Sequence, residues 1–186
     1  MQQFLFEEIL NSIFQTNETI IISSAILPRN QTTDIGILIV VDEKTNLNEY
    51  WQALASVECY AAIHGYGFQL VKINDYWKSQ CDNKNIKFLR HCIASKYLKA
   101  HEWTLVLTPD TGIVNPHQLI EDFIVEKNAD IIFYDQIFNW EISSNSYFAQ
   151  NSTFAVQFLM KFSEFENNLS ESFHGRDDVA IYVSVC

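Results

Sequence analysis

The stretch EWTLVLTPDTGIVNP, Glu102 to Pro116, decides the expected fold of this 186-residue chain. Within it, Thr104 to Leu107 is a short, branched apolar run of the kind that forms a buried strand. The run stops at Thr108-Pro109-Asp110, and Gly112 lies in the turn that follows. An open α/β sheet binds its ligand at the carboxyl ends of its strands, so Asp110 is the first candidate for chemistry.

Strands and helices are expected to alternate around this stretch. The run Ile35 to Val41 is apolar without alternation, which is typical of a central parallel strand buried on both faces. Further strands are expected at Phe68–Ile73 and Asp130–Tyr134, with helices at about Asn48–His64, Lys87–Lys99 and Pro116–Val125, and a loop containing Asp75, Trp77 and Cys81. This order predicts right-handed crossovers and an α/β fold with a Rossmann-like, mostly parallel sheet flanked by helices.

The pattern changes after the fourth strand. Residues 140–150 are expected to form an irregular strand pair, Thr153–Glu166 a long helix, and residues 172–178 a glycine-containing loop. At the other end, residues 1–34 are expected to form an amphipathic helix and a polar lead-in. A single domain over residues 35–186 is expected to follow, and Cys186 is the last residue of the sequence.

Composition excludes several classes of protein. A hydrophobic content of 48% is typical of a globular chain, and a net charge of −11 argues against a nucleic-acid partner, which requires clustered Lys and Arg. No apolar run reaches the length of about 18 residues that a membrane span needs. The amino terminus carries Glu7 and Glu8 and lacks the basic region of a signal peptide.

The cysteines and asparagines bear on the compartment. Two readings of Cys81 and Cys92 remain open, free buried thiols or one disulfide, while Cys59 lies in an apolar helical context. Four asparagines head Asn-X-Ser/Thr sequons, which weakly indicates a secretory lumen: Asn17, Asn30, Asn151 and Asn168.

Known catalytic motifs are mostly missing from the sequence. Neither glycine-rich phosphate motif occurs, which argues against a dehydrogenase or a P-loop NTPase, and no G-x-S-x-G elbow is present. Asp177 and Asp178, after His174-Gly175, form a second candidate site for sugar hydroxyls or phosphate, although a solvated turn explains them as well. Asp110 has a similar alternative, a turn carboxylate bonded to its own backbone.

Several blocks of sequence resemble a known family. YAAIHGYGFQLVKI (Tyr60 to Ile73) is similar to a stretch of many glycosyltransferases of the A-type fold. The block from Lys87 to Pro116 resembles a nematode family of uncharacterised nucleotide-diphospho-sugar transferase-like proteins, related to fungal galactosyl- and mannosyltransferases and plant xylosyltransferases. Residues 130–166 and 172–182 continue the resemblance in the same order.

The resemblance implies a glycosyltransferase that moves a hexose or pentose from a UDP- or GDP-sugar to a glycan or glycoprotein acceptor. It implies a divalent cation, Mn²⁺ or Mg²⁺, and a secretory or Golgi location. Asp110 matches the second carboxylate of the family's Asp-X-Asp motif and would bind the metal and the diphosphate. Thr108 and Gly112 would contribute further cofactor contacts, and Asp177 with Asp178 would act at the sugar or acceptor.

Two departures from the family pattern produce a second hypothesis. Thr108 stands where the family has the first carboxylate of Asp-X-Asp, and Tyr182 stands where related sequences have His. Changes around a metal site typically lower affinity or activity about 10–100-fold. The alternative to an active transferase is therefore a degenerate or truncated member that binds a glycan or a partner without turnover.

Overall fold

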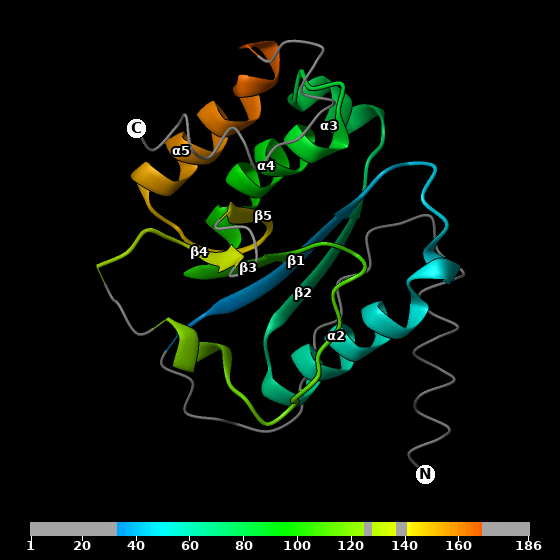
Figure 1. Cartoon of the computed structure of the whole chain (residues 1–186), viewed down its shortest axis with the longest axis vertical. Helices are drawn as coiled ribbons and strands as arrows, with labels where there is room; N and C mark the ends of the chain where they lie inside the picture. Colours follow the sequence, from blue (N-terminus) through cyan, green and yellow to red (C-terminus); the bar gives the residue numbers. More distant parts are fainter. Residues whose placement is uncertain (1–32, 125–127, 137–140, 169–186) are drawn as a thin grey trace.

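The computed structural model describes residues 33–124, 128–136 and 141–168 (Figure 1). Five strands form one mixed sheet in the order β2-β1-β3-β5-β4. β1 is parallel to β2 and to β3, whereas β5 is antiparallel to both β3 and β4. The strands are β1 (Ile35–Val41), β2 (Gly67–Lys72), β3 (Trp103–Leu107), β4 (Ile131–Gln136) and β5 (Glu141–Gln150).

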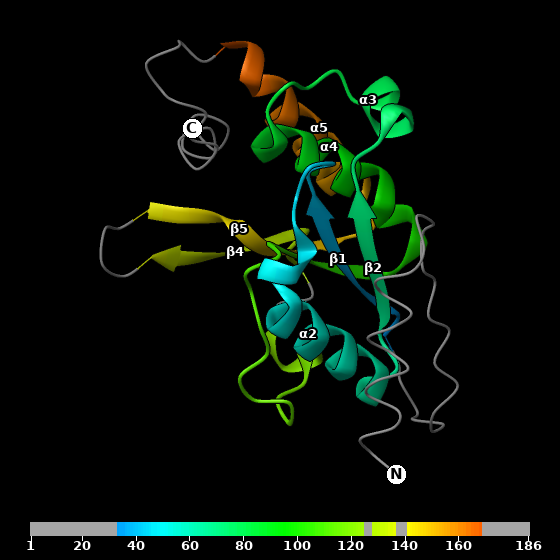
Figure 2. The same cartoon turned by 90° about the vertical axis from the view of Figure 1, so that its right-hand side faces the viewer.

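Helices cover the two faces of this sheet. α2 lies on one face, and α4 and α5 lie together on the other, while the β4–β5 hairpin extends away from the remaining strands (Figure 2). The α-helices are α2 (Trp51–His64), α3 (Asp75–Gln80), α4 (Ile86–Tyr97) and α5 (Thr153–Glu164). Short 3-10 helices are η1 (Leu47–Glu49), η2 (Leu98–Ala100), η3 (Ile120–Phe123) and η4 (Phe165–Asn168).

β1 is the centre of the core because all seven of its residues are buried. Leu38 and Val40 pack in a cluster with α4 and α5, and Ile37 and Ile39 pack in a second cluster with α2. Successive strand residues point to opposite faces, so an uninterrupted apolar run is what a doubly covered strand requires. The predicted α/β class and the mostly parallel sheet are confirmed, with β5 as the antiparallel strand.

The two ends of α2 differ in how well the sequence predicts the helix boundary. Gly65 ends the helix in the left-handed conformation (φ 71°), as its position after His64 predicts. The expected start of the helix at about Asn48 is too early, and Asn48 does not cap it. The side chain of Asn46 instead caps η1 by accepting a hydrogen bond from the Asn48 amide, and α2 itself begins after Tyr50 without a side-chain cap.

Three further predictions of local structure need correction. The expected loop around Asp75 and Trp77 is partly the helix α3, which forms because the side chain of Asn74 accepts from the Trp77 amide at 3.2 Å. The expected helix at Pro116–Val125 is reduced within the described residues to η3. The expected strand pair within residues 140–150 is the single strand β5, which pairs with β4 around a bulge.

A disulfide joins Cys81, at the end of α3, to Cys92 in α4. This settles the alternatives that the sequence left open for these two residues. Cys59 is a free thiol on α2, and it is exposed rather than part of the core. The covalent link fixes the short helix α3 to α4 and adds to the packing of the partly buried Trp77 of α3 against the core.

Candidate functional site at the carboxyl edge of the sheet

The strand order creates a topological switch point between β1 and β3. From β1 the chain crosses through α2 to β2 on one side, and from β2 it crosses through α4 to β3 on the other side. Ile39 lies opposite Leu107, so the segments that follow β1 and β3 leave the sheet at the same edge. In open α/β sheets ligands bind at the carboxyl ends of the strands, beside the point where the strand order reverses.

The segment after β3 forms a tight turn that presents Asp110. The Thr111 amide donates to the Thr108 carbonyl at 3.0 Å, and the hydroxyls of Thr108 and Thr111 are also 3.0 Å apart. Thr108 is half-buried and Asp110 is exposed at the tip of this turn. The carboxylate therefore faces solvent, and the Thr108 hydroxyl has a partner inside the turn.

Gly112 connects this turn to α2. A Cβ at Gly112 would lie 3.2 Å from Ser56 Oγ and 3.5 Å from Ala53 Cα, so the absent side chain permits a close approach to the helix. Ser56 Oγ accepts from the Ile113 amide at 3.0 Å and donates to the Ala53 carbonyl at 2.7 Å. This packing accounts for the glycine, and its predicted contact with a cofactor stays a prediction.

The rest of this loop follows α2 toward its carboxyl end. The Tyr60 hydroxyl donates to the Gln118 carbonyl at 2.6 Å, and His64 Nε2 lies 2.7 Å from the Pro116 carbonyl oxygen. The Tyr66 hydroxyl contacts the Glu121 carboxylate. These side-chain bonds to α2 take the place of the regular backbone bonds of a helix, which is why the predicted helix does not form over residues 116–119.

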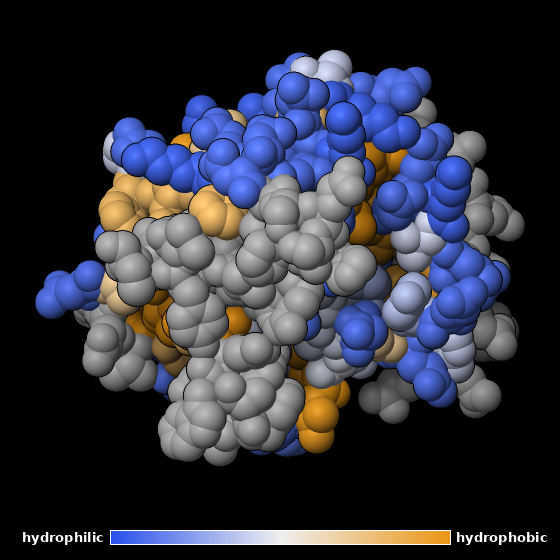
Figure 3. Space-filling model, turned by 45° about the horizontal axis from the view of Figure 1, so that its top comes forward, coloured by the Kyte–Doolittle hydropathy of each residue, from blue (hydrophilic) through white to orange (hydrophobic). Residues whose placement is uncertain are grey.

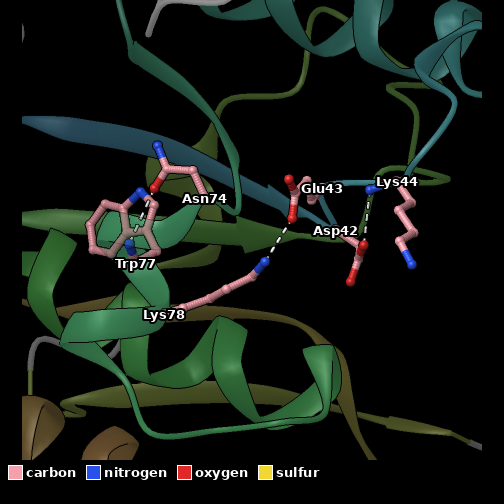
Figure 4. A network of polar contacts seen from close by, with 6 residues as sticks. All are labelled: Asp42, Glu43, Lys44, Asn74, Trp77 and Lys78. Carbon is pink, nitrogen blue, oxygen red and sulfur yellow. Dashed lines mark hydrogen bonds and ion pairs between the residues drawn. The ribbon is translucent and has the colours of Figure 1, made fainter.

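The segment after β1 adds two exposed carboxylates to the same edge (Figure 4). Asp42 Oδ1 accepts from the Lys44 amide at 2.9 Å, and Glu43 forms an ion pair with Lys78 of α3 at 2.6 Å. The hydrogen bond from Lys78 and its charge lower the pKa of Glu43, while the same contact raises the pKa of Lys78. Asp42 and Glu43 were not identified as candidates from the sequence. Their place after the most buried strand was the signal that would have identified them.

A buried polar cluster beside β5 was also missed. Arg90 of α4 donates to the Ser144 carbonyl at 3.2 Å and to its hydroxyl at 3.3 Å, and His91 Nδ1 lies 2.9 Å from the Tyr147 hydroxyl. Ser144 belongs to a bulge, because Phe133 pairs with Tyr147 and the next residue of β4 pairs with Ser143.

This cluster lies toward the carboxyl edge. Pairing between β3 and β5 ends at Val106 and Tyr147, directly before the bulge, so β5 diverges from the segment that carries Thr108. Arg90 is 8% exposed and holds the bulged backbone from the α4 side. The signal in the sequence was an arginine in the middle of the apolar helix that begins at Ile86.

The residues at this edge could bind a cation only together with a bound ligand that supplies further oxygen atoms to it. Within residues 33–124, 128–136 and 141–168, no group of three or more His, Cys, Asp or Glu side chains is placed to hold a metal ion. Asp110 offers one carboxylate, and Mg²⁺ is commonly bound by one or two carboxylates together with substrate phosphates. The predicted residues Asp177 and Asp178 lie outside the described residues.

The strongest pKa shifts occur away from this edge. Burial raises the pKa of Glu58 in α2 to about 7, and one of its carboxylate oxygens has no hydrogen-bond partner. Burial also raises the pKa of Tyr97 to about 12, with a further contribution from Asp34. Burial and then the contact with Glu121 raise the pKa of Tyr66. These groups lie in the packed interior and near the opposite edge. Burial is the largest cause of each shift, and a nearby carboxylate adds to it at the two tyrosines.

The architecture is that of a glycosyltransferase-like α/β fold. The structure is similar to the crystal structure of a glycosyltransferase involved in the glycosylation of the major capsid of PBCV-1, with a TM-score of 0.64. The two share 18% sequence identity over 82% of this chain and 76% of that chain, a level of identity that shows the fold alone.

The family is defined by the sequence. Residues 57–186 match the family described as "Protein of unknown function, DUF273", and the chain belongs to this family. No curated protein matches the chain. Across the described residues, no helix is long and apolar enough to cross a membrane.

Proposed function

We propose that this chain binds a nucleotide-diphospho-sugar at the crevice between the carboxyl ends of β1 and β3 and transfers the sugar to a glycan or glycoprotein. The observation that carries the proposal is the switch point itself. It brings the turn with Asp110 and the segment with Asp42 to one edge of a fold shared with a glycosyltransferase. A fold alone does not specify a reaction, so the argument rests on these residues.

Each residue at the crevice has a role that its chemistry allows. Asp110 would hold Mn²⁺ or Mg²⁺ together with the diphosphate, since it is exposed at the tip of a hydrogen-bonded turn. When bound, such a cation neutralises charge on the departing nucleoside diphosphate. Asp42 would accept hydrogen bonds from hydroxyl groups of the nucleotide. Thr108 would fix the turn that orients Asp110.

The proposal also includes the donor, the contacts with the sugar or acceptor, and the cellular location that were expected from the sequence. The donor would be a UDP- or GDP-sugar carrying a hexose or pentose, and Asp177 with Asp178 would contact the sugar or the acceptor. The Cys81–Cys92 disulfide supports a location in the secretory pathway, because such bonds persist in oxidising compartments. A Golgi location rests on the family resemblance.

One observation favours a second function, binding without turnover. Thr108 occupies the place of a carboxylate, and its hydroxyl lies 3.0 Å from that of Thr111 instead of being open to a ligand. A site with one carboxylate fewer carries less negative charge and would hold a cation more weakly. A protein of this kind would recognise the sugar nucleotide or a glycan and release it unchanged.

Ligand-induced stabilisation separates these proposals. We expect one UDP- or GDP-sugar to raise the melting temperature in the presence of Mn²⁺, because a ligand that binds only the folded state stabilises it. We expect Asp110→Asn to weaken this binding about 10–100-fold, in line with changes around other metal sites. Isothermal titration with and without Mn²⁺ measures the effect, and release of free sugar from the bound donor measures turnover.

Glu102→Gln provides the matched control. Glu102 is an exposed carboxylate at the opposite edge of the sheet, just before β3, so its replacement removes one charge without touching the crevice. Equal loss of binding in both variants would show that net charge, not the crevice, is responsible. Absence of binding by every donor would reject nucleotide-sugar recognition, whereas binding without sugar release or transfer would favour the second function.

A further inference from the structure

The turn between β5 and α5 carries the sequence Asn151-Ser152-Thr153. This is an Asn-X-Ser/Thr acceptor sequence for N-linked glycosylation, and it lies wholly within the described residues. Asn151 and Thr153 are both exposed. The two side chains that define the sequon are therefore on the surface of the folded chain.

The backbone of this turn is held while the asparagine side chain stays available. The Asn151 amide donates to the Glu102 carbonyl at 2.9 Å, and Ser152 Oγ caps α5 by accepting from the Ala155 amide at 3.1 Å. In the part of the chain that the structure describes, the side-chain amide of Asn151 makes no hydrogen bond. A modification at its Nδ2 atom would therefore break no contact of the native fold.

The position of the turn is compatible with the proposed site. Gln150, the last residue of β5, lies opposite Trp103, the first residue of β3, so Asn151 is at the amino edge of the sheet. Asp110 follows the other end of β3. A bulky glycan on Asn151 would project from the edge opposite the crevice and would leave the crevice open.

A second, independent observation concerns the compartment. The Cys81–Cys92 disulfide is typical of an oxidising environment, which for eukaryotic chains is the lumen of the secretory pathway, where N-glycosylation also takes place. Asn168 is also exposed, at the end of η4, but the remainder of its sequon lies beyond the described residues. Asn151 therefore heads the sequon that lies wholly within the described residues.

We propose that Asn151 carries an N-linked glycan. The anomeric carbon of a lipid-diphosphate-linked oligosaccharide forms a bond to Asn151 Nδ2, its bond to the phosphate oxygen breaks, the lipid diphosphate leaves, and Nδ2 loses one proton. The cellular oligosaccharyltransferase catalyses this step. The glycan would also shield Phe154, which is 59% exposed three residues along the chain.

Site mapping tests the proposal directly. The full chain is expressed in eukaryotic cells behind a cleavable secretion leader, and peptide mass spectrometry after peptide-N-glycosidase treatment in H₂¹⁸O reports the occupancy of each sequon. We expect Asn151 to be labelled in the native sequence. Asn151→Gln and Thr153→Ala should each remove one glycan from the intact mass, whereas Thr153→Ser should retain it, since Ser also completes a sequon.

Ser152→Ala separates folding from modification. It removes the helix cap and should lower the melting temperature, yet it leaves the sequon complete, so occupancy should persist. An unlabelled Asn151 in the secreted native chain would overturn the proposal, whether or not other sequons are occupied. Occupancy is independent of nucleotide-sugar binding, so the two proposals succeed or fail separately.

Discussion

The two edges of the sheet are built in opposite ways. At the amino edge, backbone bonds link segments that are distant in sequence: Trp103 to Asp34, Asn151 to Glu102, and Gln150 to Asp130. At the carboxyl edge, the segments after β1 and β3 combine short-range bonds, such as Lys44 to Asp42 and Thr111 to Thr108, with long-range bonds that involve side chains, such as those of Lys78 and Ser56.

The amino edge is also closely packed. His101 lies over Gly36 and Gly67, which face each other on β1 and β2, and a Cβ at either glycine would overlap the imidazole ring. His101 Nδ1 lies 2.9 Å from Asp34 Oδ1. In the view of Figure 3, hydrophilic residues of the described chain gather along the upper and right-hand margins of the molecule. The amino edge is thus closed by packing and backbone bonds, and the carboxyl edge is where we propose that a ligand binds.

Loss of the disulfide should have the largest effect and should act at the carboxyl edge. The double variant Cys81→Ser/Cys92→Ser should lower the free energy of unfolding by about 2–4 kcal/mol, because the bond constrains the unfolded chain and fixes α3. Denaturant unfolding measures the loss, and amide hydrogen exchange locates it. A larger loss of protection in α3 than in β1 would support the comparison, because β1 is fully buried and should lose only the protection that the fall in global stability removes. Uniform loss of protection would contradict it.

Gly36→Ala should act at the amino edge and cost about 1–3 kcal/mol, since the new methyl group would displace the His101 ring. The matched test is the double variant Gly36→Ala/His101→Ala, in which the ring is absent and the methyl group has room. Thermal and denaturant unfolding of both single variants and the double variant give the coupling free energy. Strictly additive losses would show that the ring and the glycine do not constrain each other.

Lys78→Met should have the smallest effect, because the Glu43–Lys78 pair is exposed and such pairs contribute little to stability. Unfolding at pH 7 should be unchanged within error. The pKa of Glu43 should rise toward its ordinary value, since the hydrogen bond and charge that lower it are removed, and an NMR pH titration reports this shift. A large fall in the free energy of unfolding would show that the Glu43–Lys78 pair stabilises the carboxyl edge more than an exposed ion pair normally does.

Much of the fold was predictable because local patterns and tertiary contacts agree. The apolar run Ile35–Val41 is β1 residue for residue, and Gly65 ends α2 as expected. The predictions failed where bonds to residues distant in the sequence replaced the bonds of the predicted local structure. Residues 116–119 are bonded to Tyr60 and His64 of α2 instead of forming a helix.

The candidate site was predicted only in part. Asp110 was recognised because it follows a buried strand, and the structure places it at the switch point. Asp42 and Arg90 were missed for a different reason. The sequence shows only that Asp42 follows a buried strand and that Arg90 lies within a helix. That Asp42 lies at the same edge as the end of β3, and that Arg90 contacts a bulge more than fifty positions away, depends on the tertiary structure.

The sequence by itself determined the α/β class, the buried central strand, and the carboxylate in the turn after β3, because each depends on residues close together in the chain. Only the tertiary structure decided the strand order, the contrast between the two edges, and the placement of Asn151 opposite the crevice. These depend on which strands pair across long stretches of chain, and pairing is set by burial on both faces of the sheet.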